Sequence, residues 1–596
     1  MSSADQYAKD IDPRSGQYTD TLDHQQQQAQ QQAQQLTQGS PTKDHTDALS
    51  EEEAGPKAHD AHSIRDEDSD VEPEQLKRAL GRRHLVMLAI GGIIGPGLLV
   101  GSGNALASAG PVGALIAFAV TGLIVYFVMQ ALGEMATLFP IRGSFIEYSG
   151  QWLDPAAGFV VGWVYWETWV SILANEYNAV AIVIQYWEPA RAVTTGGWIM
   201  IFWSIFIAFS LLGVLAYAEA EFVLASIKVI GLIVFFILSI VINVGGTGNL
   251  GYIGFRYFRD PGPFAGTGID ALNGIAKILV VSATLYAGTE STALAAAEAA
   301  NPRKAVPTAI RSVFIRILFL YLGTIFFIGL NVPWDNEQLV SASSKSAASP
   351  LTIALQRGGI NAAAHVINAL IIISVISAGN SSLYLASRTL QSLGATGRAP
   401  RLFAYTTKSG KVPIFALVFT NLVALISLLS ISGGAAKIFS YIISISGVST
   451  FVIWAAICAC HVRFRSAWVR QGNKVEDLPF KAFLYPYGTW FALVLNIVLA
   501  FFQGYTTFLN PVKAVDIVVA YIVLPVSVIL YFGWKLWHKT KIPTLDEIDL
   551  DSGRRNLKHL DEIERLDRED EEKSRLERGN QGWSKRLRGY AGRILT

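Results

Sequence analysis

The sequence has little charge for its length. Of its 596 residues, 16% are Asp, Glu, Lys or Arg, whereas 51% are hydrophobic. The charges lie mainly before residue 84, after residue 535 and in short segments between apolar runs. Each apolar run has roughly the 20 residues that cross the hydrocarbon core of a bilayer. The composition therefore excludes a soluble protein and predicts an all-α integral membrane protein.

Cysteine is also scarce, since the chain has only Cys458 and Cys460. Two cysteines two residues apart are poor candidates for a disulfide, and nothing else is available to pair with them. We expect both to be buried free thiols that pack as small apolar side chains. We also expect no metal, no cofactor, no enzymatic activity and no nucleic-acid partner.

The N-terminal segment lacks the features of a signal peptide. Residues 1–10 have neither the basic start nor the apolar core of such a signal, so the first span should direct insertion. Residues 1–75 are polar and include a Gln/Ala tract at 25–35, which predicts a disordered cytosolic tail. Lys43 and Lys57 in this tail are candidates for regulatory modification, although a solvated tail without that role fits equally well.

The middle of the chain, residues 76–540, is interpreted as the transmembrane domain. Lys and Arg at positions 77, 78, 82 and 83 precede the first span, so the chain should enter the membrane from the cytosol. Cations such as Arg463, Arg465 and Arg470 after the tenth span agree with this orientation. Both termini would then be cytosolic, including a charged C-terminal tail at 541–596. About twelve spans are predicted from their length: 85–104, 113–139, 157–187, 197–217, 221–243, 273–293, 312–333, 362–386, 412–432, 436–460, 487–508 and 513–534.

Two of these spans contain sequences that interrupt a helix. Residues 90–103 of the first span are dense in glycine and contain Pro96, and the sixth span contains Gly288 between Ala287 and Thr289. Glycine and proline weaken a helix interior, and proline removes a backbone donor. A broken helix survives in a membrane only inside protein or beside a wet cavity. Interrupted helices at matching positions of two halves indicate the binding site of a transporter.

Residues 76–555 resemble a fungal amino acid permease of the amino acid–polyamine–organocation superfamily. The resemblance is carried by motifs in the family's order: the Gly-rich first span, Leu132-Gly133-Glu134-Met135, Gly143-Ser144-Phe145, Ile184-Gln185-Tyr186-Trp187, Ala218-Glu219-Ala220-Glu221-Phe222, Ile227-Lys228-Val229, Tyr286-Ala287-Gly288-Thr289-Glu290, Ala297-Glu298-Ala299-Ala300-Asn301-Pro302-Arg303-Lys304, Ser377-Ala378-Gly379-Asn380-Ser381-Ser382 and Glu547-Ile548-Asp549-Leu550-Asp551. The chain departs from the family at Ile93 and Pro96, where the family usually has a small or polar residue and threonine.

The resemblance implies a particular architecture and activity. Spans one to five would be mirrored by spans six to ten as an inverted repeat, followed by two further spans. The first and sixth helices would be discontinuous, and amino acid uptake would be driven by the proton gradient. In related transporters a lysine at the position of Lys228 takes up the coupling proton.

A free amino acid carries a carboxylate and an ammonium on one carbon, and both can be bound by an unwound helix. Exposed amides at a half-helix N-terminus suit the carboxylate, which assigns it to Gly95, Gly97 and the backbone around Pro96, with Gly101 or Ser102 further out. Freed carbonyls suit the ammonium, which assigns it to the backbone near Ile90 and near Tyr286 and Ala287, and Gly288 at the same break is a further substrate-binding candidate. The alternative is that the glycines only allow close helix packing, although such packing does not require a proline. A dinucleotide-binding loop is excluded by the glycine spacing.

Ionisable residues inside spans are costly and are functional candidates. Lys228 either couples the proton or extends to the cytoplasmic surface, and Glu290 either binds a proton or braces the broken helix. Glu176 is a further candidate for the proton or the ammonium. Side-chain specificity is assigned to Glu176, Tyr286 and a set of polar or aromatic residues in other spans: Thr284, Asn380, Trp166 and Ser446. Three glutamates at cytoplasmic span ends either pair with loop cations or are solvated: Glu134, Glu219 and Glu221.

These observations favour a secondary active transporter that imports amino acids by proton symport with alternating access. A non-transporting amino acid sensor would keep the same site, and a permease for a related organic cation would not need the carboxylate-binding amides. The family and the lack of organelle signals predict a multi-pass protein of the plasma membrane. Cytosolic regulatory proteins or a ubiquitin ligase are candidate partners of the tails.

Overall fold

A computed structural model describes most of the predicted transmembrane domain. The described residues are 95, 97–141, 143–211, 214–291, 301–340, 349–407, 412–433, 435–509 and 512–555, with Glu562, Arg565, Leu566 and Glu569 beyond them. Within these ranges, the side chains of 214–220, 340, 432, 433, 435 and 436 are not described. The predicted tail at 1–75, the first part of the first span with Ile90, and Pro96 lie outside the described residues.

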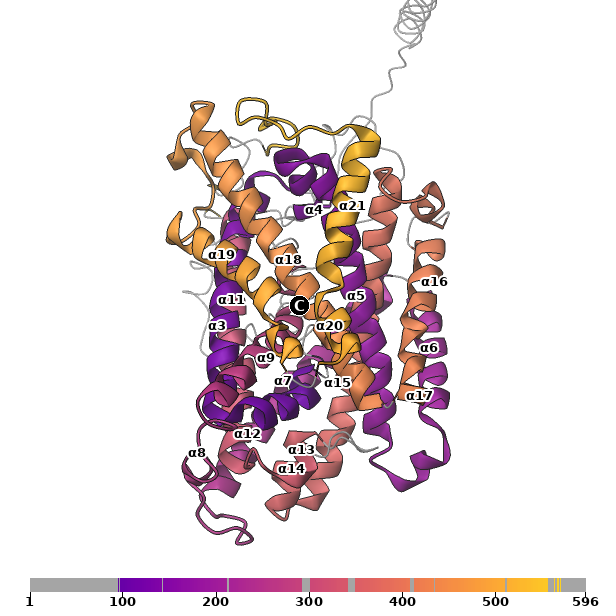
Figure 1. Ribbon diagram of the computed structural model, residues 1–596, viewed down its shortest axis with the longest axis vertical. Coiled ribbons are helices and arrows are strands. Elements are labelled where there is room, and N and C mark those ends of the chain that lie inside the picture. Colours follow the sequence, from indigo (N-terminus) through magenta and orange to yellow (C-terminus); the bar gives the residue numbers. More distant parts are fainter. Residues whose placement is uncertain are drawn as a thin grey trace, which may run out of the picture. The chain divides into compact units, whose positions relative to one another are not determined.

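The described residues form helices and no strands, which confirms the all-α prediction (Figure 1). The order along the chain is η3 (Gly97–Gly101), α3 (Ser102–Leu138), α4 (Phe145–Tyr148), η4 (Ser149–Leu153), α5 (Pro155–Ile184), η5 (Glu188–Ala192), α6 (Thr195–Ser210), α7 (Val214–Asn243), α8 (Arg256–Arg259), α9 (Ile269–Tyr286), α11 (Pro302–Ile315), η6 (Arg316–Leu322), α12 (Gly323–Asn331), α13 (Glu337–Val340), α14 (Pro350–Arg357), α15 (Asn361–Ala395), η8 (Arg401–Ala404), α16 (Ile414–Val423), η9 (Ala424–Leu429), α17 (Ser430–Gly433), α18 (Ala435–Arg470), η10 (Val475–Asp477), α19 (Tyr487–Phe502), η11 (Tyr505–Phe508), α20 (Ala514–Tyr521) and α21 (Val523–His538).

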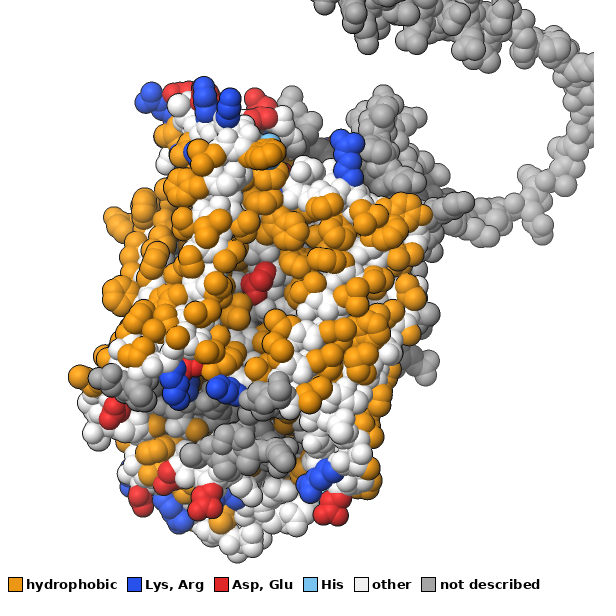
Figure 2. Space-filling view, turned by 45° about the vertical axis from the view of Figure 1, so that its right-hand side comes forward, with side chains coloured by type: hydrophobic (Ala, Val, Ile, Leu, Met, Phe, Trp, Pro, Cys, Tyr) orange, Lys and Arg blue, Asp and Glu red, His pale blue; other side chains and the backbone are white. Residues whose placement is uncertain are grey.

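Helices long and apolar enough to cross a membrane number 8 in the described part of the chain, or 9 if the bent pair of α20 and α21 is one span. Two shorter apolar segments, Thr195–Ser210 and Ile414–Leu429, coincide with the predicted fourth and ninth spans. Apolar side chains cover the middle of the face in Figure 2, apart from an acidic one near its centre, and charges gather toward both ends. The chain is a multi-pass helical membrane protein, and the count of twelve spans stays a prediction.

A sharp kink, rather than a loop, separates the first two predicted spans. The backbone leaves the helical region at Gly110, with φ of 73° and ψ of 172°, and Pro111 begins the second half of α3. A Cβ on Gly110 would lie 2.6 Å from the Cα of Phe264, so only glycine fits this left-handed backbone. Hydropathy predicts a connection at this place but does not show how short it is.

Several helices continue beyond the ends predicted from hydropathy. The predicted span 362–386 is part of α15, which ends at Ala395, and the predicted span 436–460 is part of α18, which ends at Arg470. Arg463, Arg465 and Arg470 therefore lie on the last turns of α18 and not in a loop. Apolar length marks only the part of a helix inside the hydrocarbon, whereas the hydrogen-bonded backbone continues into water.

The centre of the bundle is α5, which packs most extensively against α15 and α18 (Figure 1). Small residues permit close packing around α5, since a Cβ on Gly162 would lie 2.4 Å from the Leu393 Cδ2 of α15 and one on Gly158 would lie 2.7 Å from the Cα of Gly150 in η4. Cys458 and Cys460 are buried free thiols on α18, as predicted. The Cys460 Sγ lies 3.4 Å from the Ser149 Oγ.

Buried ion pairs hold the helix ends that are predicted to face the cytosol. The Glu134 carboxylate lies 2.5 Å from Arg465 Nε and 3.1 Å from His461 Nε2, so this glutamate is paired and not solvated. Arg398 donates two hydrogen bonds to Glu147, at 2.6 and 2.9 Å.

The first residues of the predicted C-terminal tail also pack on these helix ends. Ile548 and Leu550 are buried, and the Arg555 N–H donates to the Leu138 carbonyl at 2.9 Å. The Gln471 amide donates to the Ile548 carbonyl at 2.8 Å.

Asp154 fastens the start of α5 to the end of α21. Its carboxylate caps α5 by accepting from the Ala156 N–H at 2.8 Å. It also accepts from the Thr540 hydroxyl at 2.8 Å, from the Tyr531 hydroxyl at 3.0 Å and from Lys535. Burial of Asp154 works to raise its pKa, but the hydrogen bonds from Lys535, Ala156 and the two hydroxyls outweigh it and leave the pKa lowered.

We expect Asp154→Ala to destabilise the protein by roughly 1–2 kcal/mol, the usual cost of losing a helix cap. Because the folded-state pKa is below the unfolded value of about 3.9, the carboxylate stabilises the fold above that pH and loses its effect as the pH falls. Thermal unfolding of the purified wild type and variant should therefore differ fully at pH 7, and the difference should shrink as the pH falls from about 5 to below 4. A difference unchanged over that range would contradict an ionic role, and Asp154→Asn should retain part of the cap.

Candidate functional site

The second predicted interruption is visible in the structure, whereas at the first only Gly95 and the helix that starts at Gly97 are described. Gly95 is not helical, and a helix begins at Gly97 with a π-helical turn to Gly101. Helix α9 ends at Tyr286, because Ala287 has φ of −55° and ψ of 147° and Gly288 has φ of 85°. A positive φ is tolerated by glycine at no steric cost, so Gly288 allows the chain to turn before it becomes helical again at Thr289.

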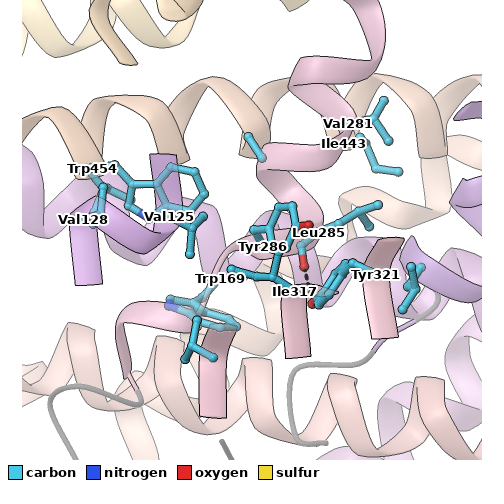
Figure 3. Packing of buried hydrophobic residues seen from close by; sticks show 14 of the residues in the cluster. Val125, Val128, Trp169, Val281, Leu285, Tyr286, Ile317, Tyr321, Ile443 and Trp454 are labelled. Atoms are coloured by element: carbon cyan, nitrogen blue, oxygen red, sulfur yellow. Dashed lines mark hydrogen bonds between the residues drawn. The ribbon is translucent and has the colours of Figure 1, made fainter. Parts of the chain in front are cut away.

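The two interruptions lie against each other. A Cβ on Gly97 would lie 1.8 Å from the Cδ2 of Leu285, the last residue but one of α9. Leu285 and Tyr286 belong to the cluster in Figure 3, together with Ile317 and Tyr321. A side chain at position 97 would therefore displace the Leu285 side chain at the end of α9.

The turn that begins at Gly97 is the start of a described helix. The first N–H groups of a helix have no partner within the helix, and the helix dipole adds partial positive charge there. The Leu99 carbonyl accepts from the Ser349 hydroxyl at 2.5 Å, which fixes this turn against the segment before α14. A carboxylate in front of Gly97 would find unpaired donors.

The side chain of Tyr286 packs into the protein core. It is fully buried, its hydroxyl donates to the Phe118 carbonyl at 3.2 Å, and its ring lies 4.3 Å from that of Tyr321. The Tyr286 carbonyl accepts from the Thr289 hydroxyl at 2.6 Å, and the Leu285 carbonyl accepts from the Tyr321 hydroxyl at 2.8 Å. A carbonyl has two lone pairs, so each keeps capacity for a second donor.

Glu290 is bonded as a brace across the break. Its Oε1 accepts from the Gly288 N–H at 3.0 Å, and its Oε2 lies 3.4 Å from the Trp454 indole nitrogen. Tyr165 also hydrogen-bonds to Glu290. With these partners, the carboxylate holds the turn at Gly288 and supports the structural interpretation over the proton-binding one.

Arg316 is a site residue that the sequence interpretation missed. It is fully buried at the start of η6, and its Nη2 donates to the Thr289 hydroxyl at 2.6 Å. Its charge also interacts with Glu290. Arg316 lies inside the predicted span 312–333, so an arginine within an apolar run was the signal that pointed to it.

A second cluster lies on the other side of Gly95. A Cβ on Gly95 would lie 3.2 Å from both the Glu176 Oε1 and the Ala378 Cβ. Glu176 is buried, and its Oε2 has no hydrogen-bond partner in the described part of the chain. Lys228 is also fully buried and interacts electrostatically with Glu176. It does not extend to the surface, which excludes the alternative interpretation of this lysine.

The prediction for Glu221 is wrong. We expected it at a cytoplasmic span end, solvated or paired with a loop cation, but it is 2% exposed and lies 3.7 Å from Lys228 Nζ. Helix α7 already begins at Val214, so Glu221 is two turns inside the helix and on the same face as Lys228. The Ser377 hydroxyl is 2.7 and 2.6 Å from its two carboxylate oxygens. The side chain of Glu219 is not described.

The remaining predicted specificity residues are placed at different helix contacts. The Thr284 hydroxyl donates to the Ile443 carbonyl at 2.8 Å and lies 3.3 Å from the Ser446 hydroxyl, so it joins α9 to α18. The Trp166 indole donates to the Thr420 hydroxyl at 3.1 Å. Asn380 is buried on α15, directly after Gly379, whose Cβ would lie 3.4 Å from the Glu176 Cβ.

Residues 84–547 match the sequence model of a family described as amino acid permease. Three proteins of Saccharomyces cerevisiae are similar to this chain. The general amino acid permease AGP3 is 44% identical and the alignment covers 82% of this chain and 87% of AGP3. The basic amino-acid permease is 38% identical, with 85% of this chain and 89% of that protein covered, and the lysine-specific permease is 40% identical, with 86% and 83% covered. A solved manganese transporter of Eremococcus coleocola has a TM-score of 0.49 and 12% identity over 78% of this chain and 97% of its own.

The family match spans nearly all of the described helices and both helix interruptions. The relatives match over more than four-fifths of their own lengths, so the likeness extends well beyond the site. The chain therefore belongs to the amino acid permease family, whose members are transporters and not enzymes.

Proposed function

We propose that this protein imports amino acids across the plasma membrane together with protons, by alternating access. The observation that carries the proposal is the contact between two broken helices, with a buried carboxylate and a buried lysine beside them, in a chain of this family. An amino acid is the class of ligand whose carboxylate and ammonium match these groups.

The substrate carboxylate binds at the N-terminal turn of the first helix, at Gly95, Pro96 and Gly97. Its ammonium lies between the carbonyls of Ile90, Tyr286 and Ala287 and the carboxylate of Glu176, the side chain with an unpartnered oxygen. Substrate binding at Gly288 uses only its backbone. Thr284 and Asn380 contribute to side-chain selection through the helices that they position.

Lys228 carries the coupling proton in this proposal. Three observations support this role. Lys228 is fully buried, it interacts electrostatically with Glu176 and Glu221, and Glu176 in turn lies beside Gly95. An ionisable group inside a transporter that faces protein and not lipid is a candidate for a proton relay. Glu290 is a brace and not a second carrier.

The wider architecture belongs to the same proposal. Twelve spans at residues 76–540 would form two inverted repeats of five and a final pair, with cytosolic tails at 1–75 and 541–596. Regulatory proteins or a ubiquitin ligase would act on those tails. The range of substrates is open, since the relatives are named as general, basic and lysine-specific permeases.

The first test is uptake of labelled amino acids into a permease-deficient host, with a panel of unlabelled amino acids as competitors. We expect accumulation against a gradient that requires an acidic exterior. Binding without accumulation would instead support an amino acid sensor. Competition by amines that lack a carboxylate, as strong as by amino acids, would support an organic cation permease.

We expect Lys228→Ala to abolish accumulation driven by a pH jump while amino acid binding stays detectable, because the variant keeps the backbone groups and loses the proton carrier. Uptake and binding should be measured on the same membranes. Lys437→Ala, at an exposed lysine near the start of α18, is the matched control and should behave as the wild type. Normal pH-driven accumulation in Lys228→Ala would remove this lysine from the mechanism.

We expect Gly97→Val to weaken amino acid binding by about tenfold or more, since overpacking of this kind typically costs 1–3 kcal/mol. The added carbons would collide with Leu285 and push the two broken helices apart. Gly101→Ala is the control, because a Cβ at that position meets nothing within 4 Å. Wild-type affinity in Gly97→Val would discredit the carboxylate site.

A further inference from the structure

Lys228 lies between two carboxylates that are bonded in different ways. Glu221, on the same helix, is 3.7 Å away and also accepts hydrogen bonds from Ser377 and Ser381 of α15. Glu176, on α5, has one oxygen beside Gly95 and a second with no hydrogen-bond partner among the described residues. Both oxygens of Glu221 are therefore engaged, whereas Glu176 has Oε1 beside Gly95 and an Oε2 without a described hydrogen-bond partner.

The position of Glu221 makes it a fixed partner. Seven residues separate it from Lys228, which is two helical turns or about 10 Å along the axis, so the two side chains extend toward each other on one face. Ser377 and Ser381 are one turn apart on α15 and hold the carboxylate from the opposite helix. Glu221 thus joins α7 to α15 and fixes where the Lys228 ammonium lies.

The charges of this cluster do not balance. Two carboxylates and one lysine leave one excess negative charge when all three are ionised, and both glutamates interact electrostatically with Lys228. An uncompensated charge in a buried membrane site is unfavourable. The cluster is therefore expected to attract one further positive charge, and only the Glu176 side has an oxygen that is free to receive it.

We propose that Glu221 is a positioning residue that sets the pH range of transport by holding Lys228, whereas Glu176 is the exchangeable carboxylate that receives the ammonium of the substrate or a proton. This division of roles rests on the proposed function. It predicts that the two glutamates, although both are neighbours of one lysine, affect different kinetic quantities.

The experiment is initial amino acid uptake as a function of external pH, in a permease-deficient host with equal amounts of each variant at the cell surface. In Glu221→Gln the lysine loses the nearby negative charge that favours its protonated form. Half-maximal uptake should move to lower pH by about one unit, a tenfold higher proton concentration, with KM at the new optimum changed less than about threefold.

Two serines of α15 provide graded controls. Ser377→Ala keeps the Glu221 charge but removes a hydrogen bond, so the midpoint should move in the same direction by a smaller amount. Ser382→Ala should leave it in place, because that hydroxyl donates to the Ala378 carbonyl of its own helix at 2.8 Å.

Glu176→Gln should change KM more than the pH midpoint, whereas Glu221→Gln should change the midpoint more than KM. The variant loses the carboxylate that faces Gly95, so KM should rise about tenfold, the scale expected for losing one charged contact with a substrate ammonium. The pH midpoint should move by less than in Glu221→Gln, since Glu221 still lies 3.7 Å from the lysine and Glu176 is the weaker of its two charged neighbours. Equal shifts of the midpoint in both glutamine variants would overturn the division of roles.

Failure of the inference is distinguishable from failure of the proposed function. A wild-type protein whose uptake does not depend on pH would reject proton coupling itself. A pH-dependent wild type with an unmoved midpoint in Glu221→Gln would reject the role of Glu221 alone. If Glu221→Gln does not reach the cell surface, Glu221→Asp and Ser377→Ala replace it, and unmoved midpoints in both would lead to the same rejection.

Discussion

The structure depends on satisfying the backbone groups that two broken helices leave unpaired inside a membrane protein. Each group would cost several kcal/mol in hydrocarbon without a partner. At the sixth-helix break the partners are side chains, namely the Glu290 carboxylate on the Gly288 N–H and the hydroxyls of Thr289 and Tyr321 on carbonyls. At the first predicted break the described residue Gly95 lies beside Glu176 and Ala378, directly before the helix that starts at Gly97.

Two groups of buried charges follow this division. Arg316 and Glu290 lie beside the sixth-helix break, where nearly every polar atom described is engaged in holding the turn. Lys228, Glu221 and Glu176 lie beside the first break, where one carboxylate oxygen has no described partner. A rigid helix break next to a carboxylate oxygen without a described partner suits a transporter, because a transport site must be preorganised and must also release its ligand.

Polar contacts between helix ends hold the surrounding helices together. Asp154 ties α5 to α21, Glu134 ties α3 to α18, and Arg398 ties the end of α15 to α4. These pairs lie far along the chain from one another and involve the central helix α5 or its direct neighbours. Their positions fix the scaffold against which α9 and the start of α3 pack.

Local chemistry was readable from the sequence: apolar length predicted the helices, and Gly288 and the glycines around Gly97 predicted where two of them break. The sequence also pointed to Lys228, because a charged side chain inside an apolar span is costly and is therefore a functional candidate. Partners were a different matter. The bonds of Glu290, the burial of Glu221, the side-chain direction of Tyr286 and the role of Arg316 depend on which helices pack together. A pattern along one helix fixes which residues share a face, but only the packing of distant segments determines what that face meets.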